Sequence, residues 1–347
     1  MKKKRRKIRY GRLAFCILVL VGLAVLICFA AKGCISLLRN DEKTDTKPKS
    51  QTSDEYSQQD IQAERIPVET EYCFDYEDIT FTEEIDAAAY DCVLKNNEDI
   101  GKGNLILVNN DYQFAFTGTE EADYLQLNLH SDDTYYVKDN TVLVNEILIE
   151  PLNEMLDDFY AVKGRQINVI SGYRSFEYQM QLYAEDLELT GLDYSTLVAL
   201  PGSSEHHTGL ALDFGILNNG EYYSYDGIGD ESWINENCHN YGFILRYLEN
   251  KEDLTHIQYE SWHFRYIGEV HAFIVNYYNM CFEEYINMLR AYEFGKRHLG
   301  IRTPNGDYEV YYVPSGVEQT EVFVPKNREY EISGNNVDGF IVTVALS

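Results

Sequence analysis

Three short segments of the sequence carry side chains whose types and spacing suit hydrolytic chemistry at a metal ion. Six residues separate His206 from Asp213 in the first segment, and two separate Glu260 from His263 in the second. Two imidazoles and one carboxylate match the ligand set of a catalytic zinc, which keeps a fourth position for water. Glu260 can approach the same site without being a ligand, and a carboxylate there can take a proton from water that attacks a carbonyl.

The third segment, SGYRSFEYQ at 171–179, places Arg174 at a predicted corner between a strand and a helix. A guanidinium is a planar fork of donors that suits a carboxylate. Taken singly, a histidine on a strand is usually a core residue, and a lone arginine or glutamate is usually a surface charge. Their combination predicts a hydrolase for a substrate that ends in a free carboxylate.

Two predicted strands position these groups. In residues 209–214, side-chain alternation puts Asp213 on one face with glycine and alanine, and puts leucines on the other face. Small neighbours leave room in front of the carboxylate for a metal or a substrate. In residues 263–267, His263 and Arg265 share one face and aromatic residues form the other.

The other predicted elements give an α+β order without regular βαβ alternation. Ser175 can cap a helix that follows the strand at 167–170, and Pro151 suits the first turn of a helix over 148–160. Further strands are expected at 105–108, 141–144 and in several segments after Gly300, and two amphipathic helices are expected within 269–292.

The amino terminus predicts a membrane anchor. Residues 1–12 hold eight basic residues, whereas the whole chain has a net charge of −28. Residues 13–31 are free of charge, and at about 1.5 Å per residue they cover roughly 28 Å, close to the thickness of a bilayer core. The run is longer than the apolar part of a cleaved signal peptide, and Lys32 disfavours a lipoprotein signal at Cys34.

The positive-inside rule then keeps the amino terminus in the cytoplasm and places the rest of the chain outside the cell membrane. Residues 40–65 are too polar to bury a core, so we expect a flexible tether there. The acidity of everything after the basic tail argues against a nucleic-acid partner. Composition leaves open whether the exterior cysteines form disulfides or are buried thiols; these are Cys73, Cys92, Cys238 and Cys281.

Three segments, SGYRS, SEHHTGLALD and ESWHFRY, resemble in order and spacing the signature motifs of the VanY-type D-alanyl-D-alanine carboxypeptidases, zinc peptidases of the cell wall. The resemblance covers roughly residues 100–295. It implies the compact α+β fold of the peptidase-hedgehog group, with Zn²⁺ as cofactor. It also implies roles for seven residues: the zinc ligands His206, Asp213 and His263, the base Glu260, and substrate contacts from Arg174, Gln179 and Ser204.

The sequence departs from the family pattern at two positions. His207 stands where the family often has glutamine, and Ser261 stands where it often has proline. His207 raises the question of which neighbouring histidine binds the metal. We choose His206 because its separation from Asp213 fits the motif.

We therefore divide the chain into five parts: a basic cytoplasmic tail (1–12), a transmembrane signal anchor (13–31), a disordered linker (32–70), a zinc carboxypeptidase domain (71–297) and a β-rich C-terminal extension (298–347). The expected function is removal of the terminal D-Ala from peptidoglycan stem peptides by a monomeric catalytic domain. An LD-carboxypeptidase, an endopeptidase or a non-hydrolytic wall-binding module with zinc are the alternatives. The sequence does not distinguish a role in glycopeptide resistance from one in wall maturation.

Overall fold

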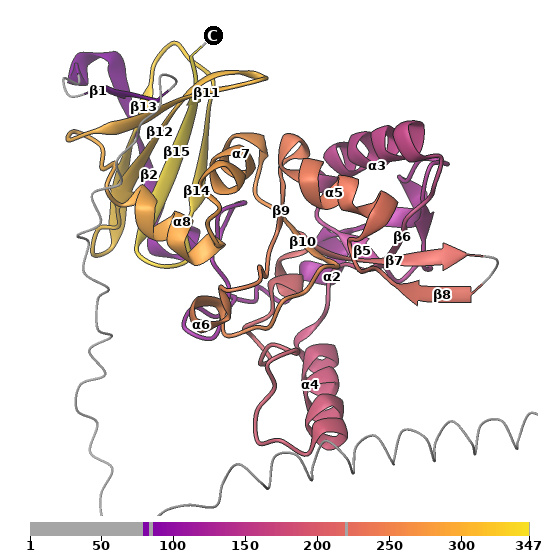
Figure 1. Ribbon diagram of the computed structural model, residues 1–347. Helices are drawn as coiled ribbons and strands as arrows, with labels where there is room; N and C mark the ends of the chain where they lie inside the picture. Colours follow the sequence, from indigo (N-terminus) through magenta and orange to yellow (C-terminus); the bar gives the residue numbers. More distant parts are fainter. Residues whose placement is uncertain (1–78, 83–85, 219–220, 347) are drawn as a thin grey trace, which may run out of the picture. The chain divides into compact units, whose positions relative to one another are not determined.

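The computed structural model describes residues 79–82, 86–218 and 221–346 (Figure 1). The predicted tail, membrane anchor and linker, and with them Cys73, lie outside these residues. Among the helices of the described part, none combines the length and the apolar character that crossing a bilayer requires. The described cysteines are free thiols: Cys92 is exposed, and Cys238 and Cys281 are buried.

A six-stranded sheet carries the predicted site strands. Its order is β4-β6-β7-β10-β9, with β8 paired to β7, and all its pairs are antiparallel except β4 with β6. The strands are β4 (Tyr136–Val137), β6 (Asn168–Ser171), β7 (Ala211–Asn218), β8 (Glu221–Ser224), β9 (Phe243–Leu245) and β10 (His263–Tyr266). The predicted strands at 167–170 and 263–267 are therefore confirmed within one residue, and the strand predicted at 209–214 begins two residues later and continues to Asn218.

Helix α3 (Ile149–Lys163) packs on the apolar face of this sheet, and Gly164 ends it in the left-handed conformation with φ 65°. Leu212 and Phe264 point into this core, as their alternation with polar neighbours predicted. The face that carries Asp213 and His263 is thereby left for the site. The buried residues of α3 recur at the spacing that predicted the helix: Leu152, Met155, Leu156 and Phe159.

Together with β1 and β2, the chain after α8 (Phe282–Leu289) forms a second sheet of order β1-β11-β12-β15-β14 and a separate pair, β13 with β2. Its strands are β1 (Ile79–Thr82), β2 (Tyr90–Asn96), β11 (His298–Thr303), β12 (Gly306–Pro314), β13 (Gln319–Pro325), β14 (Tyr330–Gly334) and β15 (Gly339–Ala345). Helices α7 (Glu269–Tyr278) and α8 share a buried apolar cluster with strands β11, β12 and β15.

This arrangement corrects the predicted boundary at residue 297. Strand β1 pairs with β11, and β2 pairs with β13. Strands that precede residue 100 therefore complete the sheets of the C-terminal extension. Residues 71–297 and 298–347 are accordingly not separate folding units. Sequence order concealed this because the pairing partners lie at opposite ends of the described chain.

The prediction of a strand at 105–108 is wrong. This apolar run is buried but irregular: Leu107 donates its backbone N–H to the carbonyl of Asn335, at 3.1 Å, and Leu105 donates to Ser333 Oγ, at 2.9 Å. It packs in the cluster of α7 and α8. A short apolar run shows burial without showing the kind of backbone. The strand expected at 141–144 shortens to β5 (Leu143–Val144), paired with β3 (Leu125–Gln126).

The remaining elements are short except for α4 (Phe176–Thr190), which lies with η5 (Glu205–Thr208) between β6 and β7. The others are η1 (Ala87–Ala89), η2 (Asn97–Gly101), α2 (Glu120–Asp123), η3 (Leu127–Leu129), η4 (Glu146–Leu148), η6 (Gly229–Glu231), α5 (Ser232–Asn237), η7 (Cys238–Tyr241) and α6 (Glu252–Thr255).

Candidate metal centre

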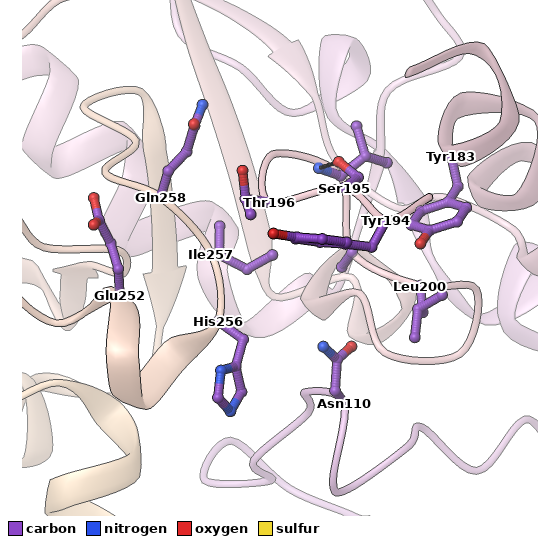
Figure 2. A pocket seen from close by; sticks show the side chains of 12 residues that line it. Asn110, Tyr183, Tyr194, Ser195, Thr196, Leu200, Glu252, His256, Ile257 and Gln258 are labelled. Atoms are coloured by element: carbon purple, nitrogen blue, oxygen red, sulfur yellow. Dashed lines mark hydrogen bonds between the residues drawn. The ribbon is translucent and has the colours of Figure 1, made fainter. Parts of the chain in front are cut away.

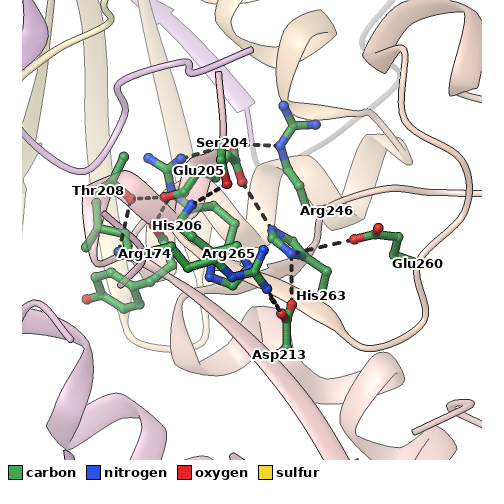
Figure 3. Close-up of polar contacts among 12 residues, drawn as sticks. Arg174, Ser204, Glu205, His206, Thr208, Asp213, Arg246, Glu260, His263 and Arg265 are labelled. Atoms are coloured by element: carbon green, nitrogen blue, oxygen red, sulfur yellow. Dashed lines mark hydrogen bonds and ion pairs between the residues drawn. The ribbon is translucent and has the colours of Figure 1, made fainter. Parts of the chain in front are cut away.

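Strand pairing places two of the predicted ligands side by side. Asp213 on β7 and His263 on β10 are direct partners in the antiparallel register. The Nδ1 atom of His263 lies 3.1 Å from Oδ1 of Asp213 (Figure 3). Both side chains are buried.

A tight turn brings the third ligand to the same point. Ser204 caps η5 by accepting a hydrogen bond from the His206 N–H, and Gly209 ends η5 at φ 66°. A Cβ at Gly209 would lie 3.0 Å from the backbone nitrogen of Asn145, so this position requires glycine on both counts. His206 Nδ1 contacts the carbonyl of Gly172, at 2.6 Å, and its Nε2 points to Asp213 Oδ2, at 3.3 Å.

The three side chains fit a bound cation. One ligand atom from each of His206, Asp213 and His263 lies within 4.8 Å of the others. His206 Nε2 is buried without a hydrogen-bond partner among the described residues, which is costly unless something else occupies that position. Two imidazoles with a carboxylate form a common ligand set for zinc.

The electrostatics of the cluster agree with this fit. Burial, and then the Arg174 charge, lower the pKa of His206 to about 4, so its ring is neutral at physiological pH. The pKa of the Asp213 carboxyl lies well below its ordinary value; burial opposes this shift, but the contact with His206 and the charge of Arg174 prevail. Burial would lower the pKa of His263, but contacts with Asp213, Glu205 and Glu260 raise it to about 9. The surrounding carboxylates thus favour positive charge at this point.

Glu260 lies beside this cluster and is not one of the three candidate ligands. Its Oε2 is 3.6 Å from His263 Nδ1, and its side chain is buried. Burial raises the pKa of Glu260 to about 7, and nearby Asp213 adds to the shift while the charges of His263 and Arg174 reduce it. A carboxylate with this proton affinity is suited to take and return a proton near neutral pH.

Arg174 reaches the cluster from the corner between β6 and α4. Its guanidinium donates to the carboxylate of Asp213 and to Ser171 Oγ, the latter at 3.1 Å. Only 18% of the side chain is exposed. Ser175, the next residue, caps α4 as expected by accepting the Tyr178 N–H at 3.2 Å.

The other two predicted substrate contacts, Gln179 and Ser204, line one cavity with the groups described above. Gln179 donates its side-chain amide to the carbonyl of Ala199, at 2.8 Å, and its Oε1 has no partner among the described residues. Ser204 and Gln179 border a cavity of about 260 Å³, together with all five other predicted site residues. The structure therefore brings together the full set: Arg174, Gln179, Ser204, His206, Asp213, Glu260 and His263.

His207 is bound differently from His206. Its Nδ1 lies 2.7 Å from the carbonyl of Arg174, and its Nε2 accepts the N–H of Gly202 at 3.0 Å. Its ring packs against Phe116, with centroids 4.8 Å apart. Both ring nitrogens are thus used by the backbone, so His207 is a structural neighbour of the site.

The sequence analysis overlooked a charge cluster behind the histidines. Glu205 Oε1 pairs with Arg246 Nε at 2.8 Å and with Arg265 Nη1 at 3.0 Å, and all three side chains are buried. Two signals in the sequence pointed to this cluster: Glu205 is adjacent to His206, and Arg265 lies on the same face of β10 as His263. The sequence could not pair them because Arg246 lies on a separate segment.

A larger cavity adjoins the metal cavity. It measures about 570 Å³, and the two cavities share Val198, Ala199 and Ile257 as lining residues. Figure 2 shows Tyr194, His256 and Asn110 among the side chains that surround it. The metal cavity thus has a second, larger cavity next to it.

Comparison with known proteins agrees with this geometry. The family model of VanY, described as D-alanyl-D-alanine carboxypeptidase, matches residues 141–269. A D-alanyl-D-alanine carboxypeptidase of Enterococcus faecium is 38% identical over 252 residues, which cover 71% of this chain and 77% of the relative. The bifunctional D-Ala-D-Ala dipeptidase and carboxypeptidase VanXYC of Enterococcus gallinarum is 37% identical over 36% of this chain and 68% of its own length.

A solved structure extends the similarity to the fold. The vancomycin-resistance D,D-dipeptidase VanXYg, crystallised with a D-Ala-D-Ala phosphinate analogue, superposes with a TM-score of 0.66 at 31% identity. The match covers 74% of this chain and 99% of that protein. On its sequence, its fold and its clustered site residues, the chain belongs to the VanY family of D-alanyl-D-alanine carboxypeptidases.

Proposed function

We propose that this protein is a membrane-anchored zinc carboxypeptidase that removes the terminal D-Ala from peptidoglycan stem peptides outside the cell membrane. One observation carries the catalytic part: Arg174, Glu260 and the three candidate ligands line a single cavity. This cavity combines a group that binds a carboxylate with a proton acceptor and a metal site. The related carboxypeptidase of Enterococcus faecium supports the choice of D-alanyl-D-alanine as substrate.

Each residue has a separate task in this proposal. His206 through Nε2, His263 through Nδ1 and the Asp213 carboxylate would hold zinc, which supplies a polarising charge and a water of lowered pKa. Glu260 takes the proton of the attacking water and returns it to the departing amine. The contacts of Arg174 with Asp213 and Ser171 leave guanidinium donors free for the terminal carboxylate of the substrate.

The larger cavity favours a carboxypeptidase that accepts long substrates. It begins at the wall it shares with the metal cavity, so it offers space to the residues that precede the cleaved bond. Gln258 donates its N–H to the carbonyl of Thr196, at 2.9 Å, and this bond joins the segments that form two of its sides. We expect Tyr194→Ala to raise KM for a pentapeptide more than for free D-Ala-D-Ala.

The activity is tested with the purified full-length chain, synthetic penta- and tetrapeptide stems, and mass spectrometry of the products. We expect loss of one D-Ala from the pentapeptide. Arg174→Ala should lower kcat/KM for the free acid far more than for the C-terminally amidated peptide, because the amide offers no charge to pair. Cleavage of the tetrapeptide alone would favour an LD-carboxypeptidase, and binding without cleavage a wall-binding module.

Metal content tests the ligand set. The parent chain should hold about one zinc, and alanine at His206, Asp213 or His263 should weaken zinc binding sharply. His207→Ala is the matched control, since both of its ring nitrogens bond to the backbone. Loss of zinc in the His207 variant with full zinc in the His206 variant would contradict the assignment.

The proposed topology follows from residues 1–31. A reporter fused after Ser347 should be active outside the cell, and protease added to intact protoplasts should release the catalytic part. Protection of the carboxyl terminus from that protease would contradict the anchor.

A further inference from the structure

One oxygen of the Glu205 carboxylate, Oε2, has no role in the proposed mechanism. The other oxygen, Oε1, is bound by two arginines, whereas Oε2 has no hydrogen-bond partner in the described part of the chain. Oε2 lies 3.7 Å from Nε2 of His263, and that nitrogen is also buried and without a hydrogen bond among the same residues. Two buried polar atoms that face each other in this way form a natural donor and acceptor pair.

We infer that Glu205 is the positioning residue of His263. Its carboxylate accepts the Nε2–H of the imidazole and so fixes the tautomer whose lone pair lies on Nδ1, the atom that faces Asp213. The pair is 3.7 Å apart, and the inference requires it to close to the usual N–H···O distance of about 2.9 Å. Metal-bound histidines commonly have such a carboxylate behind them. The inference depends on the zinc site of the proposed function.

The rest of the charge cluster holds this carboxylate in place. Arg246 also pairs with Glu283 on α8, at 3.0 and 2.6 Å. Arg265 also donates to the carbonyls of Asn104 and Ile106, both at 3.0 Å. Two arginines and two glutamates balance in charge, but their burial is expensive, and packed apolar side chains stabilise a core equally well. A requirement for one oriented carboxylate at His263 explains why this position of the core holds charged side chains and not apolar ones.

The second histidine has a similar arrangement, which supports the inference. His206 Nδ1 lies 2.6 Å from the carbonyl of Gly172, which fixes its proton there and leaves Nε2 to face Asp213. Each imidazole thus has an acceptor behind the nitrogen that turns away from the cluster. Because Glu205 and His206 are adjacent, η5 supplies one ligand and the acceptor for the other.

Glu205→Gln provides a sharp test because glutamine has a single acceptor oxygen. Two cationic donors compete for that oxygen, so the amide NH₂ must turn toward His263 Nε2. The NH₂ group then requires a lone pair at Nε2, which moves the proton to Nδ1 and blocks metal binding there. We expect zinc affinity, measured by competition with a chelator, to fall about 10–100-fold.

Glu283→Gln is the matched control. Glu283 belongs to the same cluster, and its hydrogen bonds within the described residues are with Arg246 and Asn109, not with His263. This variant should lower the free energy of unfolding and keep zinc affinity within about twofold of the parent. Zinc affinity in Glu205→Gln that also stays within twofold would overturn the inference.

A measurement on the unmodified chain covers the case in which Glu205→Gln does not fold. With ¹⁵N-labelled histidine and bound zinc, long-range ¹H–¹⁵N correlation should show the His263 proton on Nε2. A proton on Nδ1 in the zinc-bound chain would overturn the inference and the choice of Nδ1 as the ligand atom, whereas zinc binding by the chain itself would stand. A parent chain that binds no zinc would instead overturn the proposed function on which it rests.

Discussion

Asp213 and Glu260 are two buried carboxylates whose surroundings give them different proton affinities. Asp213 contacts Arg174 and His206, and its pKa lies well below the ordinary value. Burial raises the pKa of Glu260 to about 7, although His263 Nδ1 lies 3.6 Å from its Oε2 and reduces the shift. Pairs of carboxyl groups separated in this way divide their roles, one as a permanent anion and one as a proton carrier.

At the residue scale, Glu260→Gln separates proton transfer from metal binding. The variant keeps the shape of the side chain, and because Glu260 is not in the ligand cluster, zinc content should match that of the parent. We expect kcat to fall by about 10²–10⁴, the usual contribution of a positioned general base. Single-turnover hydrolysis and zinc analysis of the same sample provide the measurement. A variant that hydrolyses at the parental rate would show that another group is the base.

At the element scale, α4 is a wall of the site whose start depends on one hydroxyl. Ser175 caps the helix, and α4 supplies Gln179 to the metal cavity and Tyr183 to the larger one. Ser175→Ala should cost about 1 kcal/mol of the free energy of unfolding. Ser175→Asp keeps an acceptor and is the matched control. Urea titration compares the two, and equal stabilities would argue against the cap.

A buried histidine links α7 to the second sheet and should make that link sensitive to acid. His271 contacts Tyr285 of α8 at 2.6 Å and Thr343 of β15 at 2.8 Å, and burial lowers its pKa to about 3. The unfolded chain, with an ordinary pKa near 6.5, therefore binds a proton first as pH falls. Stability contributed above pH 6.5 is lost toward pH 3, and by pH 5 the loss is about 2 kcal/mol.

Urea unfolding at pH 7 and pH 5 tests this link. His271→Gln should remove that share of the acid sensitivity, and His130→Gln, on the exposed surface, should leave it unchanged. An identical change in stability between the two pH values in parent and His271→Gln would contradict the assignment.

How far the sequence predicted these elements depended on whether local chemistry determined them. Alternation around Asp213 and His263 predicted the faces of β7 and β10, and the hydroxyl of Ser175 predicted the start of α4. The irregular backbone at 105–108 depends on partners such as Asn335, far along the chain, which no local pattern encodes. The pairing of Glu205 with Arg246 was hidden for the same reason.

At the scale of the whole molecule, the C-terminal strands are part of the core that supports the catalytic sheet. Leu299 of β11 is fully buried in one apolar cluster with Ile267, which follows β10, and with residues of α8. Leu299→Ala should cost about 2–5 kcal/mol of the free energy of unfolding. The matched control is Leu129→Ala, whose side chain is 70% exposed.

Removal of everything after Arg297 should expose this cluster and give an insoluble chain. Solubility, circular dichroism and hydrolysis of the pentapeptide check the outcome. A soluble truncated chain with parental activity would contradict this prediction and show that residues 298–347 are an independent extension.

The pairing of β1 with β11 and of β2 with β13 also has a consequence for folding kinetics. Ile79 pairs with Ile301, so nearly the whole described chain forms the loop that this contact closes. Contacts of such long range are entropically costly to form and slow the folding of a domain. During synthesis, β1 and β2 are made first and stay unpaired until β11 and β13 have been made. We therefore expect refolding to be slow and prone to aggregation, with activity regained only as these late strands pair.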